Sequence, residues 1–218
     1  MQTETYQVEG FRSVVLRQFG VLHISQGQQE SLSVEADPEV LARLEPAVRD
    51  DTLHLSQKRK WWDAILDGLR VGFDRQKVTY HLVVKDLERL EIPGAALVRA
   101  GGLDSEKLSI VLGGAGDIQV DDLQARELVV VLRGAGAVKL NGRADSQTVT
   151  LTGVGSYSAS ELESRIARVT VSGAGKASVW ATEQLETALR GVGSIEYRGS
   201  PAVTKSITGV GSIKQIEG

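Results

Sequence analysis

A three-residue motif, two glycines separated by alanine or valine, recurs six times in the second half of the chain. The copies are Gly114-Ala-Gly116, Gly134-Ala-Gly136, Gly153-Val-Gly155, Gly173-Ala-Gly175, Gly191-Val-Gly193 and Gly209-Val-Gly211. Their first glycines follow one another at steps of 20, 19, 20, 18 and 18 residues, and one more step of 20 backwards leads to a degenerate copy, Gly94-Ala-Ala96. Of the 24 glycines, 5 lie in residues 1–93 and 19 in residues 94–218. The chain therefore carries seven repeat units, and its fold has to explain that period.

The residues around each motif alternate between apolar and polar. Around Gly134 the apolar positions are Val130, Leu132, Val138 and Leu140, and the positions between them are mostly polar. Alternation with a period of two indicates β-strands, because neighbouring side chains of a strand point to opposite faces. Each unit is therefore predicted to be two short strands around a glycine bend, with the apolar side chains sharing one interior.

Glycine suits such a bend because a positive φ costs other residues about 1–2 kcal/mol, whereas glycine loses only about 0.5–1 kcal/mol in chain entropy. We therefore interpret the twelve motif glycines as structural corners. A unit of 18–20 residues is too short for a β-α-β crossover, which takes about 30, but it fits one coil of a parallel β-helix. Seven coils stacked about 4.8 Å apart would make a rod roughly 30 Å long, and parallel crossovers are almost always right-handed.

The predicted fold class is thus all-β: a right-handed parallel β-helix, or solenoid, of 18–20-residue coils, with a less regular β-rich N-terminal part and a short helical insert. The alternative is a β-sandwich whose hairpin turns happen to contain glycine. Hairpin loops seldom keep a near-constant spacing with the same flanking pattern, so the β-helix is favoured.

Residues 1–93 are β-rich but irregular, and we expect them to form one continuous domain with the glycine-cornered repeats of residues 94–218. These strands either add coils to the rod or form a small sheet that continues it. A short helix is expected over Pro38–Leu44, with Asp37 as its N-cap and Pro38 in its first position. The expected strands are Val14–Leu16, Val21–Ile24, Leu32–Val34, Leu53–Leu55 and Val78–Val84.

An insert at residues 58–73 differs from its surroundings. Trp61, Ile65 and Leu69 recur at helical spacing, which predicts a short amphipathic helix. The favoured interpretation is a lid that packs Trp61 and Trp62 over an end or a side of the solenoid. Basic residues beside the two tryptophans also fit a contact with a membrane surface, and a partner-binding lid is the third possibility.

Composition excludes several classes of function. With 28 acidic and 25 basic residues the net charge is −3, whereas nucleic-acid-binding proteins usually have a basic face. There is no cysteine, so disulfides, thiolate metal sites and cysteine nucleophiles are excluded. No apolar run approaches the roughly 20 residues of a transmembrane helix. The N-terminus lacks the pattern of a signal sequence, so either the protein stays inside the cell or the chain begins after a removed signal.

Motifs that carry chemistry are scarce. His23, His54 and His81 lie in strand patterns without metal-like neighbours. Neither a Gly-x-Ser-x-Gly elbow nor a phosphate loop is present. A calcium-binding repeat is approached only at Gly113–Asp117, with its aspartate one place early. We therefore expect no cofactor and no metal.

Some β-helices cleave polysaccharides with two carboxylates about 5–10 Å apart. The nearest candidates here are Asp121 or Asp122 against Glu161, but a whole coil lies between them. We therefore expect no catalytic residues and no enzymatic activity.

Three features together resemble the bacterial putative auto-transporter adhesin, head GIN domain family. They are the recurrent Gly-Ala/Val-Gly motif, the start Phe11-Arg-Ser-Val-Val-Leu with Val21-Leu-His-Ile-Ser-Gln-Gly27, and the late Tyr197-Arg-Gly-Ser-Pro201. The likeness covers about residues 11–216. It implies a right-handed β-helix, usually on exported bacterial proteins. It carries over no catalytic residues, and the Trp61-Trp62 insert departs from the family pattern.

The leading functional hypothesis is a non-enzymatic module of the cell envelope or surface, adhesin-like, that binds a protein or glycan partner through its β-helix faces. A possible homo-oligomer would form through the terminal coils or the 58–73 insert. The alternatives are an intracellular β-helix scaffold that assembles end to end, and a carbohydrate-active enzyme. Neither a nucleic-acid partner nor an integral membrane segment is expected.

Overall fold

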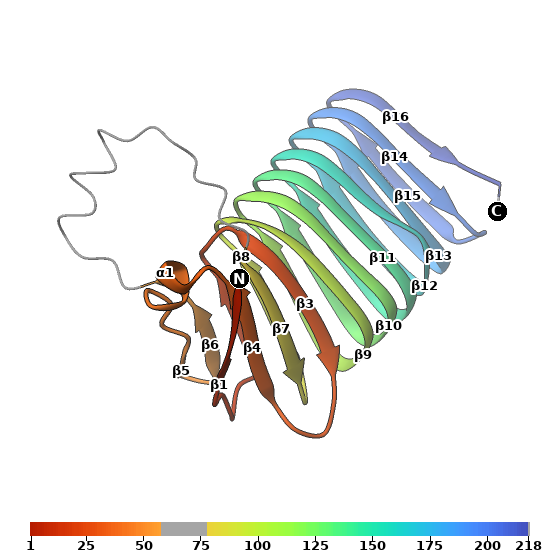
Figure 1. The fold of residues 1–218 in the computed structure, drawn as a ribbon. Helices are drawn as coiled ribbons and strands as arrows, with labels where there is room; N and C mark the ends of the chain where they lie inside the picture. Colours follow the sequence, from red (N-terminus) through yellow and green to blue (C-terminus); the bar gives the residue numbers. More distant parts are fainter. Residues whose placement is uncertain (58–77, 218) are drawn as a thin grey trace, which may run out of the picture.

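The computed structural model describes residues 1–57 and 78–217, which form a parallel β-solenoid of about six turns (Figure 1). The expected strand-rich rod is confirmed. Its regular part consists of β9 (Ala95–Leu112), β10 (Ala115–Leu132), β11 (Ala135–Leu151), β12 (Val154–Val171), β13 (Ala174–Leu189), β14 (Val192–Arg198), β15 (Ala202–Ile207) and β16 (Val210–Gln215). Each pairs in parallel with the strand one coil away, and the repeats are in register, Gly116 opposite Gly136 and Gly136 opposite Gly155.

Each coil from β9 to β13 is one long strand rather than the two short strands that the apolar pattern predicted. The glycine corner interrupts the strand, but the second bend of the coil does not. Between β9 and β10 the pairing continues around that bend, and in the next three pairs it resumes after a register shift. Asp121 still pairs with Gly101 there, and Leu123 with Leu103. The left-handed backbone needed for this bend falls on Gly102, Asp122 and Gly142.

The glycine corners have a cause that the sequence argument did not contain. Positive φ accounts for Gly116, Gly136, Gly193 and Gly211, whose φ values lie between 137° and 157°. At all twelve motif positions, however, an added Cβ would overlap a backbone carbonyl oxygen of the preceding coil. Close stacking of backbone on backbone, rather than φ alone, therefore excludes side chains from this edge of the rod.

The N-terminal part is built from β1 (Gln2–Tyr6), β2 (Ser13–Leu16), β3 (Gly20–Gln26), β4 (Ser31–Ala36), α1 (Pro38–Leu41), β5 (Ala47–Arg49), β6 (Thr52–Leu55), β7 (Thr79–Val84) and β8 (Arg89–Ile92). The expected strands are present to within two residues at each end, and the short helix begins at Pro38 as expected but ends at Leu41 and not at Leu44. At Asp37 the side chain makes no capping hydrogen bond, and its carboxylate lies 3.7 Å from the amino group of Met1 instead.

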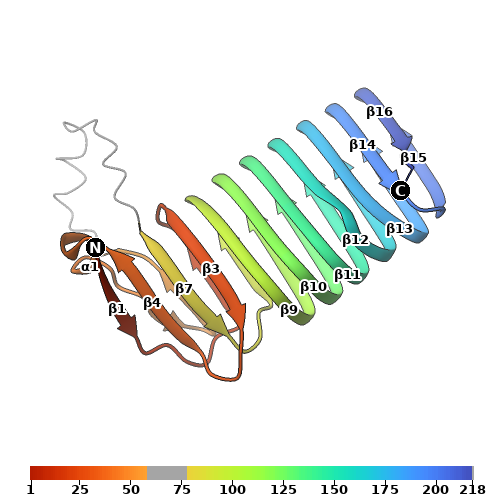
Figure 2. The same ribbon diagram turned by 45° about the vertical axis from the view of Figure 1, so that its right-hand side comes forward.

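The order of the coils in space differs from their order in the sequence at this end. β2 lies between β6 and β8, and β3 lies between β7 and β9, so the coil of β2 and β3 is interposed between two coils that come later in the chain. Beyond it, β4 pairs antiparallel with β7, and β1 antiparallel with β4 (Figure 2). Both sequence alternatives therefore hold: these strands add coils to the rod and also continue it as a small antiparallel sheet.

One hydrophobic cluster fills the solenoid from Val8 to Ile213. Within it, Tyr157 donates a hydrogen bond of 2.9 Å to Oε1 of the buried Gln147, whose Nε2 donates to the Ser164 hydroxyl at 2.7 Å. Ser164 in turn donates to the Trp180 carbonyl at 2.6 Å.

Among the described residues Tyr80 is the contrasting case, since its buried hydroxyl has no hydrogen-bond partner. Burial raises the pKa of both tyrosines well above the ordinary value, so both hydroxyls stay protonated at alkaline pH where an exposed tyrosine would ionise.

Replacing Gly155 by valine tests the stacking argument. The new side chain would overlap the Gly136 carbonyl, and we expect a loss of at least about 3 kcal/mol, seen as a fall of roughly 10 °C in the thermal midpoint. Ser158→Val is the matched control, because it places the same side chain on the outward face of the same strand. Equal melting of the two variants would contradict the argument.

Removing the hydroxyl group from each of the two buried tyrosines, Tyr157 and Tyr80, provides a second test. Tyr157→Phe removes the donor to Gln147 and leaves a buried amide oxygen unpaired, which should cost about 1–3 kcal/mol in the free energy of unfolding. Tyr80→Phe removes a hydroxyl that has no partner, and its stability should be unchanged or raised. Denaturant titrations of both variants measure the difference, and a larger loss in Tyr80→Phe would be inconsistent with these hydrogen bonds.

Candidate binding site

The structure places the residues that the sequence singled out at separate points of the rod. The twelve corner glycines follow one edge, where they serve close packing. Trp61, Trp62, Ile65 and Leu69 lie outside the described residues, so the lid and partner-contact interpretations stay predictions. His23 and His81 lie on the neighbouring strands β3 and β7 with their rings stacked at 5.2 Å.

The carboxylates considered for catalysis are held in a polar ladder. Asp121 accepts hydrogen bonds from the side-chain amides of Gln119 at 2.9 Å and Asn141 at 2.7 Å. Asn141 is itself the register partner of Glu161, so one coil separates the two acids, as the repeat spacing predicted. Both neighbouring side-chain amides donate their hydrogen bonds to Asp121. The surroundings of Asp121 and Glu161 therefore resemble a structural ladder of hydrogen bonds more than a catalytic acid–base pair.

The approximate calcium motif is also used structurally. Asp117 accepts a hydrogen bond from the backbone N–H of Ala137 at 3.1 Å, which ties two coils together. Within residues 1–57 and 78–217, no group of three or more histidine, aspartate or glutamate side chains is arranged to hold a metal ion.

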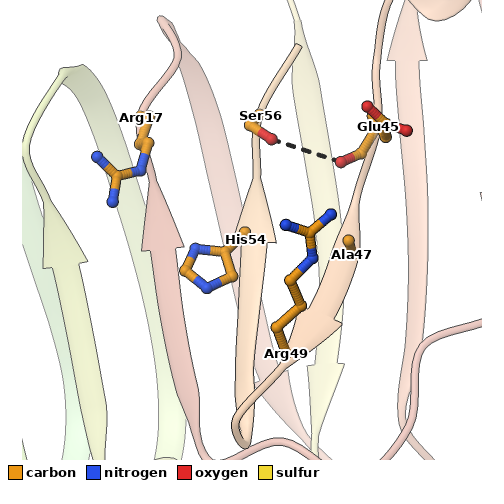
Figure 3. Close-up of a pocket in the computed structure, with 6 residues that line it drawn as sticks. All are labelled: Arg17, Glu45, Ala47, Arg49, His54 and Ser56. Atoms are coloured by element: carbon orange, nitrogen blue, oxygen red, sulfur yellow. Dashed lines mark hydrogen bonds between the residues drawn. The ribbon is translucent and has the colours of Figure 1, made fainter. Parts of the chain in front are cut away.

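A hollow of about 240 Å³ lies in the face formed by β2, β6 and β5 (Figure 3). Its lining residues are Arg17, Glu45, Ala47, Arg49, His54 and Ser56. Pairing between the strands builds it: His54 in the middle strand lies opposite Val15 of β2 and opposite Ala47 of β5. We call this hollow, defined by its six lining residues, the basic pocket.

Alternation along the strands sets which side chains reach the basic pocket. Leu53 and Leu55 point into the core, so His54 and Ser56 point outward. The small side chain of Ala47 leaves room beside the imidazole. Figure 3 shows the Arg49 guanidinium on one side of His54 and the Arg17 guanidinium on the other. The Ser56 hydroxyl donates to the Glu45 carbonyl at the rim, at 3.5 Å.

Several arginines elsewhere on the rod have a carboxylate partner one coil away. Examples are Arg143 with Glu163 at 3.0 Å and Arg165 with Glu183 at 2.7 Å. In that second pair the hydrogen bond lowers the pKa of Glu183 below its usual range. In the described part of the chain, neither Arg17 nor Arg49 has such a partner. Two exposed guanidinium groups therefore flank the basic pocket, and no carboxylate of the described residues occupies their N–H donors.

A second hollow, of about 730 Å³, lies near the other end of the rod. Its lining includes Trp180 and Arg198 on β13 and β14, together with Gln215. The Arg198 guanidinium already covers the Trp180 ring at 4.4 Å, and Gln215 donates to the Gly199 carbonyl at 2.7 Å. The Arg198 and Gln215 side chains of this hollow are thus already engaged, by the Trp180 ring and by the Gly199 carbonyl.

Sequence reasoning did not find the basic pocket. Arg17, Arg49 and His54 form no motif, and they meet only because β6 pairs in parallel with β2 and antiparallel with β5. The alternation around His54 was the available signal, since it predicts an outward imidazole, but it does not name the neighbouring strands.

Comparison with known proteins agrees with this architecture. A structure of an adhesin-like protein from Bacteroides fragilis, described as a putative adhesin, superposes with a TM-score of 0.88 at 29% identity, covering 99% of this chain and 96% of that one. A putative adhesin from Parabacteroides merdae (TM-score 0.70, 17% identity, 99% and 95% coverage) and a putative lipid binding protein from Parabacteroides distasonis (0.68, 20%, 99% and 96%) share the fold.

The curated proteins include no match to the chain. In the described part of the chain, none of the helices has the length and apolar character to cross a membrane. The family model described as putative auto-transporter adhesin, head GIN domain, matches residues 10–201, which is most of the sequence. The chain therefore belongs to the head GIN domain family of putative auto-transporter adhesins.

Proposed function

We propose that this protein is a non-enzymatic, adhesin-like module of the cell envelope or surface that holds a glycan or protein partner against the faces of its solenoid. The observation that carries the proposal is the basic pocket, in which two arginines and a histidine are displayed on a rigid sheet without carboxylate partners among the described residues. Membership of a family named for adhesins supports it.

The rest of the solenoid surface is suited to display rather than to chemistry. Ion pairs such as Lys107 with Glu127 and Arg126 with Glu106 join neighbouring coils at 3.2–3.3 Å. Exposed pairs of this kind contribute little to stability, about 0–1 kcal/mol each, and the register between the coils is what sets the outward residues in columns. A partner would meet a preorganised array, which lowers the entropy cost of binding.

A second candidate, end-to-end assembly, has a specific observation in its favour. At the C-terminal end of the described chain, Val210 is 71% exposed and Ile207 48% exposed on the outermost strands β16 and β15. Apolar side chains on an outer strand favour contact with another chain. Light scattering over a concentration series tests it, and particle size independent of concentration would exclude it.

The proposed function is tested by binding of the purified full chain to a glycan array and to intact cells. We expect saturable binding to a restricted set of ligands, without release of cleaved products. The heat-unfolded chain is the control, because a contact that depends on the folded solenoid should be lost on unfolding. Absence of any glycan or cell-surface binding, or turnover of a bound glycan, would refute the proposal.

A further inference from the structure

We infer that the basic pocket binds the acidic group of a saccharide, the carboxylate of a uronic acid or the sulfate of a sulfated sugar. The inference rests on the proposed function and gives its ligand a chemical class. Guanidinium groups suit this ligand because their planar, forked N–H donors hold a carboxylate or sulfate through two parallel hydrogen bonds. Arg17 and Arg49 offer two such forks on opposite sides of one hollow.

The charge around the hollow favours an anion. The lining contains two guanidinium groups and one acidic side chain, that of Glu45. Figure 3 shows the Glu45 carboxylate directed away from His54. Asp50 and Asp51 form the turn between β5 and β6, but neither carboxylate makes an ion pair with Arg49 in the described structure. Within the lining itself the two arginines outnumber the one carboxylate, in a chain whose net charge is −3.

The size and the floor of the hollow favour a sugar over a larger ligand. A cavity of about 240 Å³ is smaller than the roughly 300–1,000 Å³ pockets that enclose drug-sized molecules, so it accommodates one ring with its charged substituent. The Ala47 methyl group and the His54 ring give an apolar floor for the C–H face of that ring, while the remaining units of an oligosaccharide extend over the open face. The imidazole adds one N–H donor even when neutral.

The test compares the wild-type chain with Arg17→Gln, Arg49→Gln and the double variant by isothermal titration calorimetry. Probes are a sulfated oligosaccharide, a uronic acid oligomer, a neutral glucan of equal length, inorganic sulfate, and vesicles containing anionic lipid. Arg133→Gln is the matched control, because it removes the same charge from an exposed arginine that has no carboxylate partner among the described residues. Thermal midpoints of all variants should agree, since none of these side chains is buried.

We expect at least one acidic oligosaccharide to bind, and each pocket variant to raise its Kd about tenfold, with no measurable binding in the double variant. Arg133→Gln should change Kd less than about twofold, and added salt should weaken binding. Four results would overturn the inference: equal weakening by Arg133→Gln, equal affinity for the neutral glucan, equal affinity for inorganic sulfate, or binding to the vesicles alone.

The outcome also separates this inference from the proposed function. If the wild type binds a glycan or a cell surface and the double variant binds it equally well, the basic pocket is not the site and this inference fails, while the adhesin-like function keeps the support of the observed binding and of family membership. If the wild type binds no partner at all, both fail together.

Discussion

Backbone hydrogen bonding between successive coils holds their main chains about 4.8 Å apart, and the rest of the structure adapts to that distance. At the tight corner the chain turns with its backbone pressed against the corner below, so a Cβ at Gly134 or Gly136 would occupy the place of a carbonyl oxygen. Glycine is required there by the neighbouring coil, and not only by the conformation of the turn. The 18- to 20-residue period is the length of chain needed to return to that point.

This constraint explains which parts of the fold the sequence could predict. Because the stacking repeats in every coil, the glycine motif recurs in the sequence at a nearly constant spacing. That period can be recognised without knowledge of any contact. The second bend leaves no such period, because it is made by different residues in different coils, Gly102 in one and Asp122 in the next. A strand that continues around an irregular bend therefore looks like two strands in the sequence.

The N-terminal part and the basic pocket depend on register between strands that are distant in the sequence. Nothing near Arg17 indicates that β2 will have β6 on one side and β8 on the other. The pocket follows from that arrangement, together with the small side chain of Ala47 and the outward direction of His54. Local pattern thus predicts which way each side chain points, whereas only the assembled sheet determines which side chains meet.

The interposed coil has a consequence for how the molecule assembles. β2 and β3 are made early during synthesis, yet each needs a flanking strand from both β6–β7 and β8–β9 to satisfy its two edges. The first coil of the chain must therefore wait for nearly half of the polypeptide before it can be completed. In a solenoid, order spreads from any stable pair of neighbours, and the matched glycine repeats β9 to β13 offer the longest uninterrupted contacts between consecutive segments. Order would then spread from these repeats into the coil of β2 and β3, which cannot be completed before β9 is in place.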